Sequence, residues 1–163
     1  MGADGSGAPV GAVAPKLEYA FTWDAVATPV HNVGTQMVWN VTSIDMHGPD
    51  IKGSSVSPAG DWITIMPNGV WYLDVRFSVL LDDGSHAYCH YNGIGDMTPE
   101  QIETIQAGGT IPGDAMYFYS TPYFQTDSEK HAWLGRHVFI GCMREFGSGK
   151  VIYDVFKVAG GAK

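Results

Sequence analysis

GVWYLDVRFSVLLDDGSHAYCHYNGIG, residues 69–95, is the most informative stretch of this chain. Two runs rich in β-branched and aromatic residues flank Asp83-Gly84, the dipeptide most typical of a two-residue type I′ turn, so the segment predicts a β-hairpin. Side chains alternate between the two faces of a strand, and one face of the first strand is apolar throughout. That face consists of Trp71, Leu73, Val75, Phe77, Val79 and Leu81.

The opposite face of the hairpin is polar. With Asp83 and Gly84 as the turn, Arg76 lies opposite Tyr91, and residues opposite each other share a face. The polar face then carries Tyr72, Asp74, Arg76, Ser78 and Tyr91. This face combines Asp74 and Arg76 with tyrosine side chains, whereas a simple outer surface would be expected to carry Lys, Glu and Thr. We therefore predict that the apolar face packs as the core and that the polar face lines a pocket.

The composition favours a single all-β domain. A chain of 163 residues can bury a core without disulfides or metals. Charged residues make up only 16%, whereas the chain has 21 Gly, 8 Tyr, 7 Phe and 5 Trp. Low charge with abundant glycine and aromatic residues is typical of β-domains with many turns.

Charge and hydropathy exclude two classes of partner. The formal net charge is −8 with nine Lys and Arg, so we expect no nucleic-acid partner. No apolar run approaches the length of a transmembrane helix, and the N-terminus lacks the pattern of a signal peptide, so we expect no membrane partner. The predicted location is cytoplasmic, with Cys89 and Cys142 as reduced thiols.

Two regions of the chain differ in pattern. Residues 1–16, MGADGSGAPVGAVAPK, have no periodicity and are predicted to form a disordered tail. Residues 17–160 contain about nine short strand-like runs separated by turn signals, and we predict that they form one domain.

One short helix is predicted near residues 98–107. Thr98 fits the N-cap, Pro99 the first helical position and Gln101 the reciprocal position of a capping box. About nine strands with one short helix and many tight turns predict an antiparallel sheet closed into a barrel, or a sandwich.

A series of different short motifs is spread along nearly the whole ordered chain, from Leu17 to Val158. They are Gly48-Pro49-x-x-x-Gly53, Gly60-Asp61-Trp62, Asp74-Val75-Arg76, Asp82-Asp83-Gly84, Gly93, Tyr117-Phe118, Thr121-Pro122-x-Phe124, Trp133-Leu134-x-Arg136 and Val151-x-Tyr153-Asp154-Val155. In their order and spacing the chain resembles the domain-of-unknown-function family DUF3237. The resemblance implies an antiparallel, lipocalin-like β-barrel that is oligomeric and needs no cofactor. Some fungal relatives are cyclases that add a phenol oxygen across a prenyl double bond by intramolecular hydroalkoxylation.

The chain departs from the commoner family pattern at four positions. An Arg is common where Tyr119 stands, an Asn where Gly135 stands, an Asn near Tyr91 and a small residue near Asp45. These replacements imply a roomier, more aromatic pocket that suits a flat aromatic ligand.

The candidate catalytic residues are Asp74, Arg76 and Tyr91. Asp74 and Arg76 lie two apart on one strand, so their side chains can pair. In the functional interpretation Asp74 donates or accepts a proton, Arg76 sets its pKa, and Arg76 and Tyr91 orient a substrate oxygen. In the alternative interpretation the pair is structural and is kept only because it is well hydrogen-bonded.

Six further residues are candidate substrate-binding residues: Tyr72, Asp45, Asp61, Tyr119, Phe124 and Trp133. Asp61 is either a carboxylate at the barrel mouth or a cap of its own turn, and Asp45 is either a second carboxylate in the cavity or an exposed turn residue. The aromatic rings either line a cavity or fill the core.

We expect neither a metal site nor a bound cofactor. The six His residues show no HxH, HExxH or Cys-His spacing. The chain also lacks a GxSxG nucleophile elbow, a Walker loop and a GxGxxG motif that opens a helix.

The leading hypothesis is a cofactor-free cyclase of secondary metabolism that acts on a prenylated or otherwise unsaturated phenolic substrate. The first alternative is a non-catalytic barrel that carries a small phenolic or hydrophobic ligand. The second is an isomerase or dehydratase that uses the same Asp–Arg pair. Exposed edge strands favour assembly, so we expect a homo-oligomer.

Overall fold

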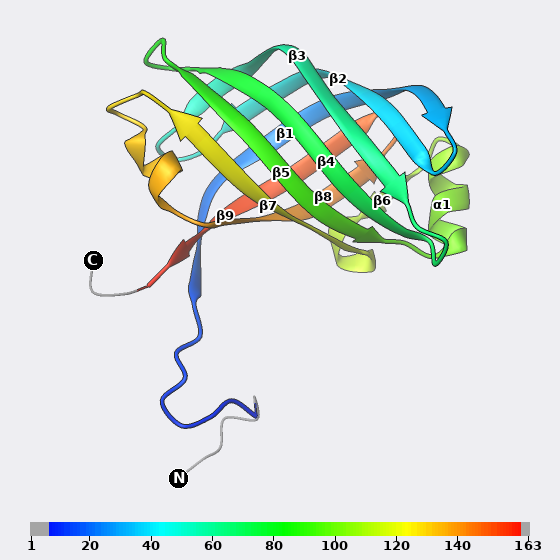
Figure 1. The fold of residues 1–163 in the computed structure, drawn as a ribbon, viewed down its shortest axis with the longest axis horizontal. Coiled ribbons are helices and arrows are strands. Elements are labelled where there is room, and N and C mark those ends of the chain that lie inside the picture. Colours follow the sequence, from blue (N-terminus) through cyan, green and yellow to red (C-terminus); the bar gives the residue numbers. More distant parts are fainter. Residues whose placement is uncertain (1–6, 161–163) are drawn as a thin grey trace.

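The computed structural model describes residues 7–160. Within this range nine antiparallel strands are accompanied by one α-helix and two short 3₁₀ helices (Figure 1). The strands are β1 (Lys16–Val33), β2 (Gln36–His47), β3 (Lys52–Ile65), β4 (Val70–Leu81), β5 (His86–Asp96), β6 (Thr110–Pro112), β7 (Tyr117–Thr126), β8 (Phe139–Gly147) and β9 (Lys150–Ala159). The helices are α1 (Pro99–Gln106), η1 (Gly113–Ala115) and η2 (Ala132–Arg136).

The sheet closes on itself. The strand order is β6-β8-β7-β5-β4-β3-β2-β1-β9, and an additional β8–β9 pairing joins the two ends. Eight strands therefore form a closed antiparallel barrel, and β6 pairs with β8 outside the ring. The predicted all-β barrel with about nine strands and one short helix is confirmed, and the sandwich alternative is excluded.

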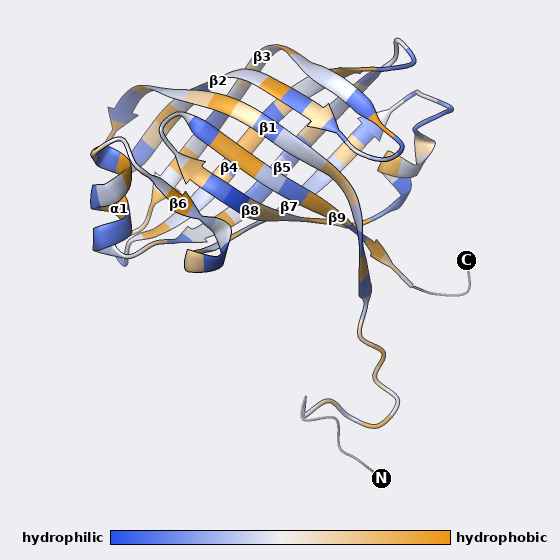
Figure 2. Ribbon diagram, turned by 180° about the vertical axis from the view of Figure 1, so that it is seen from behind, coloured by the Kyte–Doolittle hydropathy of each residue, from blue (hydrophilic) through white to orange (hydrophobic). Residues whose placement is uncertain are grey.

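The barrel interior is the hydrophobic core. Buried and more exposed positions alternate along β4, and the predicted apolar face from Trp71 to Leu81 is buried at every second residue. Figure 2 shows the same alternation of hydrophobic and hydrophilic residues along the barrel strands. Trp23 from β1 packs against Phe77 of this face, and Phe146 from β8 packs against Trp71. Trp23 also contacts the rings of Tyr91 and Phe124.

The β4–β5 hairpin is confirmed, but its loop is longer than predicted. The Leu81 N–H donates to the Ser85 carbonyl at 2.8 Å and the Gly84 N–H donates to the Leu81 carbonyl at 3.0 Å. The loop therefore has three residues, Asp82, Asp83 and Gly84. The φ angle of Gly84 is 83°, the left-handed conformation that closes three-residue hairpin loops.

The extra loop residue shifts the register by one. Arg76 pairs with His90, and Tyr91 pairs with Val75. A one-residue shift moves every side chain of a strand to the other face, so Tyr91 faces the core. The prediction that Tyr91 shares a face with Asp74 and Arg76 is wrong for this reason.

The pairing of β3 with both of its neighbours shifts register near the middle of the strand. Its pairing with β2 shifts register between Asn40 and Asp45, and its pairing with β4 shifts between Val56 and Gly60. The segment between these shifts contains the cis Ser57–Pro58 bond, and we call residues 57–59 the β3 bulge. Regular ladder pairing on both sides of β3 is interrupted here.

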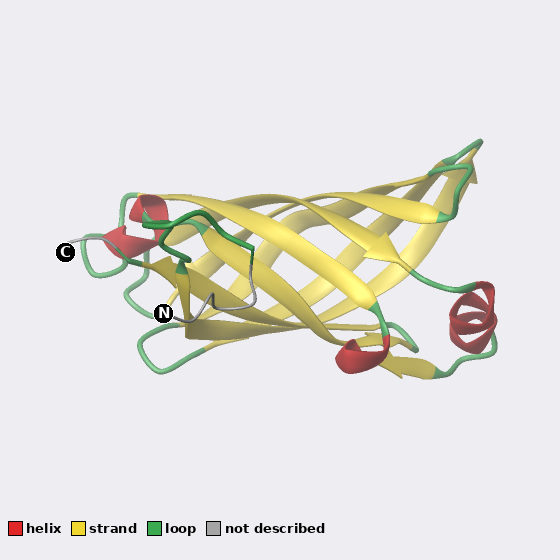
Figure 3. Cartoon of the chain, turned by 90° about the horizontal axis from the view of Figure 1, so that it is seen from below, coloured by secondary structure: helices red, strands yellow, loops and turns green. Residues whose placement is uncertain are grey.

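Helical segments lie at opposite ends of the barrel (Figure 3). At one end α1 begins with the predicted capping box, in which the Gln101 N–H donates to Thr98 Oγ1 at 3.2 Å and the Thr98 N–H donates to Gln101 Oε1 at 3.0 Å. At the other end η2 places Trp133 against the rings of Phe21 and Phe139.

The segment before β1 lies outside the barrel. Residues 1–6 of the predicted tail lie outside the described residues, and residues 7–15 form neither helix nor strand. Figure 1 shows them extending away from the barrel. Cys89 and Cys142 are both free thiols. Among residues 7–160, no helix combines the length and the hydrophobicity needed to cross a bilayer.

Candidate active site

Three polar side chains meet inside the barrel. Asp61 comes from β3, Tyr91 from β5 and Tyr153 from β9, and all three line the same two small cavities. The cavities measure about 20 and 30 Å³, enough for roughly one or two water molecules each. We call these three residues the Asp61 cluster.

Asp61 is the unusual member of the cluster. Its Oδ1 atom is buried and, within residues 7–160, has no hydrogen-bond partner. The pKa of Asp61 is raised from 3.8 to about 7, chiefly by burial; a backbone hydrogen bond with Asp74 opposes the rise, and the negative charge of Asp74 adds a smaller increase. Neutral and ionised forms of Asp61 therefore coexist at neutral pH. A carboxyl group poised in this way can both donate and accept a proton.

The two phenols of the cluster stay protonated. Burial raises the pKa of Tyr91 and of Tyr153 well above the ordinary tyrosine value, and the negative charge of Asp61 adds to both shifts. Both hydroxyls are therefore hydrogen-bond donors at physiological pH. The Tyr153 hydroxyl is buried and, among the described residues, has no partner of good geometry.

More polar atoms in and around the core have no protein partner. Considering only residues 7–160, the indole N–H groups of Trp23, Trp39 and Trp71 and the Ser120 hydroxyl are also buried and unpaired. Trp39 is the β2 partner of Asp61. Native interiors leave few buried polar groups unpaired, and each one calls for an explanation such as a bound water or ligand.

A cleft of about 690 Å³ lies over the β3 bulge. Its wall includes Pro58, Trp62 and Arg76. Trp39 lines both this cleft and one interior cavity, and Phe77 lines both the cleft and the other cavity. Trp39 and Phe77 are therefore shared walls of the cleft and of the interior cavities that the Asp61 cluster lines.

Asp74 and Arg76 lie on the outer face of β4. Their side chains are 40% and 53% exposed. Asp74 Oδ1 is 2.9 Å from His90 Nε2 and 3.4 Å from Arg76 Nε. The polar face lies outside the barrel, because the apolar face of β4 fills the interior and the alternate positions face outward. Its residues still line concave surfaces, Tyr72 an outer groove and Arg76 and Ser78 the cleft, so only their predicted place inside the barrel is wrong.

The other predicted binding residues are dispersed. Tyr72 and Tyr119 are exposed and line an outer groove of about 720 Å³ on the β4–β5–β7–β8 wall. Phe124 is buried in the core, and Trp133 packs on the core from η2. Asp45 is exposed, with its Oδ2 atom 3.0 Å from His47 Nδ1. Of these residues only Asp61 comes together with Tyr91, and it does so inside the barrel rather than in a cap of its own turn.

Tyr153 and Trp39 belong to the site but were not singled out as site residues from the sequence. The sequence carries little signal for Tyr153, because both faces of β9 are largely apolar: Ile152 and Phe156 alternate with Tyr153 and Val155, and only the structure shows that Tyr153 and Val155 are the buried pair. No sequence signal places Asp61 beside them, since this depends on which strands meet across the barrel.

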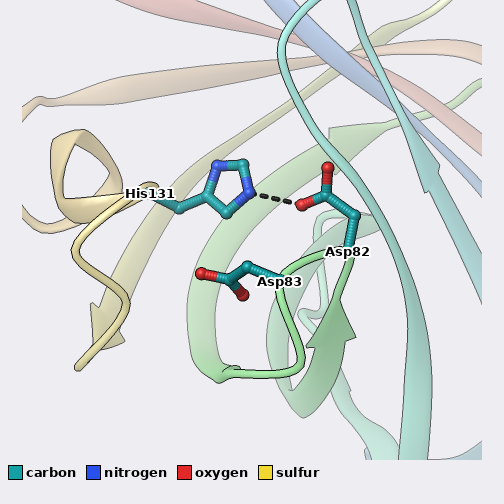
Figure 4. Close-up of side chains that lie close together, drawn as sticks. All are labelled: Asp82, Asp83 and His131. Carbon is teal, nitrogen blue, oxygen red and sulfur yellow. Dashed lines mark hydrogen bonds and ion pairs between the residues drawn. The ribbon is translucent and has the colours of Figure 1, made fainter.

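A second polar cluster fastens the hairpin loop to the segment before η2 (Figure 4). Asp82 Oδ1 is 2.5 Å from His131 Nε2, and Asp82 Oδ2 accepts a hydrogen bond from Lys130 at 2.8 Å. The Ser128 hydroxyl donates to Asp83 Oδ2 and also accepts the His131 N–H. The ligand atoms of the two aspartates and the histidine lie within 4.8 Å of one another, and these hydrogen bonds engage all three side chains. We call the cluster the loop latch.

We expect Asp82→Asn to loosen the loop latch. Hydrogen bonds from Lys130 and His131 lower the pKa of Asp82 from 3.8 to about 2, so the folded state favours the ionised form. This contribution to stability is present above about pH 4 and is lost as the pH falls through 2. The variant should melt a few degrees below the parent protein at pH 6, and the difference should vanish near pH 2. Thermal unfolding followed by circular dichroism across this range measures both, and equal melting temperatures at pH 6 would contradict the assignment.

Comparison with known proteins gives one family. The family model described as "Protein of unknown function (DUF3237)" matches residues 15–158. A UPF0311 protein of Clostridium acetobutylicum is 31% identical over 110 residues, which cover 68% of this chain and 70% of that protein.

Solved structures with the same fold include a conserved protein of unknown function from Rhodopseudomonas palustris. It has a TM-score of 0.81 at 24% identity, over 91% of this chain and all of that one. A structure described as an enzyme from Penicillium herquei has a TM-score of 0.69 at 15% identity, over 93% of this chain and all of that one. At these identities the structures show the shared fold alone. Because the family model spans nearly all of the barrel, this chain belongs to the DUF3237 family.

Proposed function

We propose that this protein is a cofactor-independent acid–base enzyme that closes an oxygen ring on an unsaturated phenolic substrate by intramolecular hydroalkoxylation. The observation that carries the proposal is Asp61, whose buried and unpaired carboxyl oxygen faces two neutral phenols and whose pKa is about 7. That a structure similar in fold is described as an enzyme is compatible with catalysis in this barrel.

The proposed reaction uses Asp61 first as an acid and then as a base. The neutral carboxyl group of Asp61 donates its proton to one alkene carbon, and the phenol oxygen forms a C–O bond to the other. The phenol O–H proton then returns to the Asp61 carboxylate, so the enzyme is regenerated and the product is an isomer of the substrate. Tyr91 and Tyr153 are placed to donate hydrogen bonds to the oxygen while it approaches.

The surroundings of Asp61 suit a cationic transition state. Trp23 and Tyr91 stack with ring centroids 5.6 Å apart and an interplanar angle of 18°. Aromatic faces attract positive charge. The apolar interior also excludes bulk water, which would otherwise add to the cation.

A carrier without catalytic activity is the second candidate. It is favoured by the size of the cleft over the β3 bulge, since about 690 Å³ is the volume of a typical small-molecule site. A carrier would use the same unpaired interior groups to bind its ligand and would release the ligand unchanged.

The test is incubation of the purified protein with prenylated phenols and naphthols without added cofactor, followed by chiral chromatography. We expect one enantiomer of a cyclic ether to form faster than in buffer, in Asp74→Asn as well as in the parent protein. Loss of turnover in Asp74→Asn would move the acid–base role to the outer carboxylate. Binding of every substrate without product would favour the carrier.

A further inference from the structure

We propose that the cleft over the β3 bulge binds the aromatic part of the substrate and that Arg76 pairs with an anionic oxygen on that ring. The ligand class is a planar aromatic acid, in which the anionic oxygen belongs to a carboxylate or to a second, acidic phenol and is distinct from the phenol oxygen that forms the ring. The inference names the substrate class of the proposed reaction and rests on that reaction for its catalytic meaning, although its test requires only binding.

The wall of the cleft is suited to a flat ring. Trp62 and Tyr88 are 43% and 37% exposed, and both line the cleft together with Pro58. A large aromatic side chain left in contact with solvent loses the free energy of burial, and a ring bound against it recovers that free energy. Exposed aromatic residues grouped around a concave surface are typical of ligand-binding sites.

Arg76 gives the cleft its charge preference. It is the charged residue in the cleft lining, in a chain whose formal net charge is −8. Its Nε lies 3.4 Å from Asp74 Oδ1, a long contact, while His90 holds the same carboxylate oxygen at 2.9 Å. Within residues 7–160 the terminal nitrogens of Arg76 have no acceptor. A guanidinium with free terminal nitrogens binds carboxylates through two parallel hydrogen bonds.

The position of the cleft connects it with Asp61. Gly60 and Trp62, the chain neighbours of Asp61, both line the cleft, and Trp39 lines the cleft as well as an interior cavity. The interior cavities of about 20 and 30 Å³ are too small for a ring system. With the ring in the cleft, the alkene and the reacting phenol oxygen therefore reach the Asp61 carboxyl group only by displacing Trp39, the side chain that lines both the cleft and an interior cavity.

The test compares 2-naphthoate with 2-naphthamide, which has nearly the same shape and no charge. We expect the parent protein to bind naphthoate about tenfold more tightly, as measured by calorimetry at low salt. Arg76→Gln should bring the two dissociation constants together by weakening naphthoate alone, whereas Trp62→Ala should weaken both ligands. Lys52→Gln is the matched control, because it removes one exposed positive charge from the same strand as the bulge without touching the cleft, and it should keep the preference.

Several outcomes overturn the inference. Equal binding of the two naphthalenes by the parent protein, or an unchanged preference in Arg76→Gln, removes Arg76 from recognition. Naphthoate-induced NMR shifts confined to the groove of Tyr72 and Tyr119 place the ligand elsewhere. Sedimentation showing that Trp62→Ala separates an oligomer into monomers makes the cleft an interface between copies of the chain.

The binding preference for naphthoate can be measured whether or not the protein turns over a substrate. Asp61→Asn should keep the naphthoate preference whether or not Asp61 is catalytic. A protein that prefers naphthoate through Arg76 but turns over no phenol would support the cleft and contradict the proposed reaction.

Discussion

Asp61→Asn is expected to reduce turnover at least about a hundredfold, because an amide can neither donate the proton to the alkene nor take one back from the phenol. The loss should appear in kcat with little change in KM, since the variant keeps the size and shape of the side chain. In the parent protein kcat should depend on one ionisation near pH 7, the pKa of Asp61, and activity should fall as the pH rises through it.

The same substitution should raise the stability of the protein above pH 7. The folded state raises the pKa of Asp61 from 3.8 to about 7, so folding favours the protonated form. The resulting penalty on the folded state is absent below pH 3.8, grows between pH 3.8 and 7, and is constant above pH 7. At about 1.4 kcal/mol per pKa unit, it reaches roughly 4 kcal/mol. Asn has no such penalty, although its buried amide costs a pH-independent 1–3 kcal/mol or so.

Urea unfolding of both proteins at pH 5, 6, 7 and 8 measures this effect. The stability of the variant relative to the parent should increase with pH and level off above pH 7. Asp96→Asn is the matched control, because it removes an exposed carboxylate at the end of β5 that has no part in the shift of the Asp61 pKa. Parallel stability curves for Asp61→Asn and the parent would show that the carboxyl group is not poised near neutrality.

Trp23→Ala is expected to destabilise the fold by about 3–5 kcal/mol, the usual cost of removing a large buried ring. Trp23 is 2% exposed and touches the rings of Phe21, Phe77, Tyr91, Phe124 and Tyr153. Domains of this size are stable by about 5–15 kcal/mol, so the variant should lose a large share of its stability.

Trp62→Ala separates the effect of burial from the effect of residue type. Trp62 is 43% exposed and lies at the cleft, so its removal should cost less than about 1 kcal/mol. Urea unfolding of the two variants beside the parent measures both changes. Equal destabilisation by the two substitutions would contradict the placement of Trp23 at the centre of the core.

Local signals in the sequence were sufficient for several elements. The capping box of α1 formed as predicted, because it depends on Thr98 and Gln101 three residues apart in one turn. The apolar face of β4 is the core face, because period-two alternation is a property of one strand. These features need no information about the rest of the chain.

The register of the β4–β5 hairpin was the point at which local reasoning was insufficient. Asp83-Gly84 is typical of a two-residue turn, yet Asp82 joins the loop, and its side chain is held by Lys130 and His131 in the loop latch. The three-residue loop is thus held by contacts with a segment about 50 residues away, and the Asp83-Gly84 dipeptide alone does not predict its length. The one-residue shift that follows exchanges Tyr91 and His90 between the two faces.

The sequence by itself determined the fold class, the short helix and the apolar faces, since propensity, turn chemistry and alternation act between near neighbours. Only the tertiary structure decided which polar residues lie together. Asp61, Tyr91 and Tyr153 come from three strands that are distant in sequence, and barrel closure directs their side chains into one buried interior. Burial there raises the pKa of Asp61, while Asp74, a carboxylate on the next strand, remains exposed on the outer face.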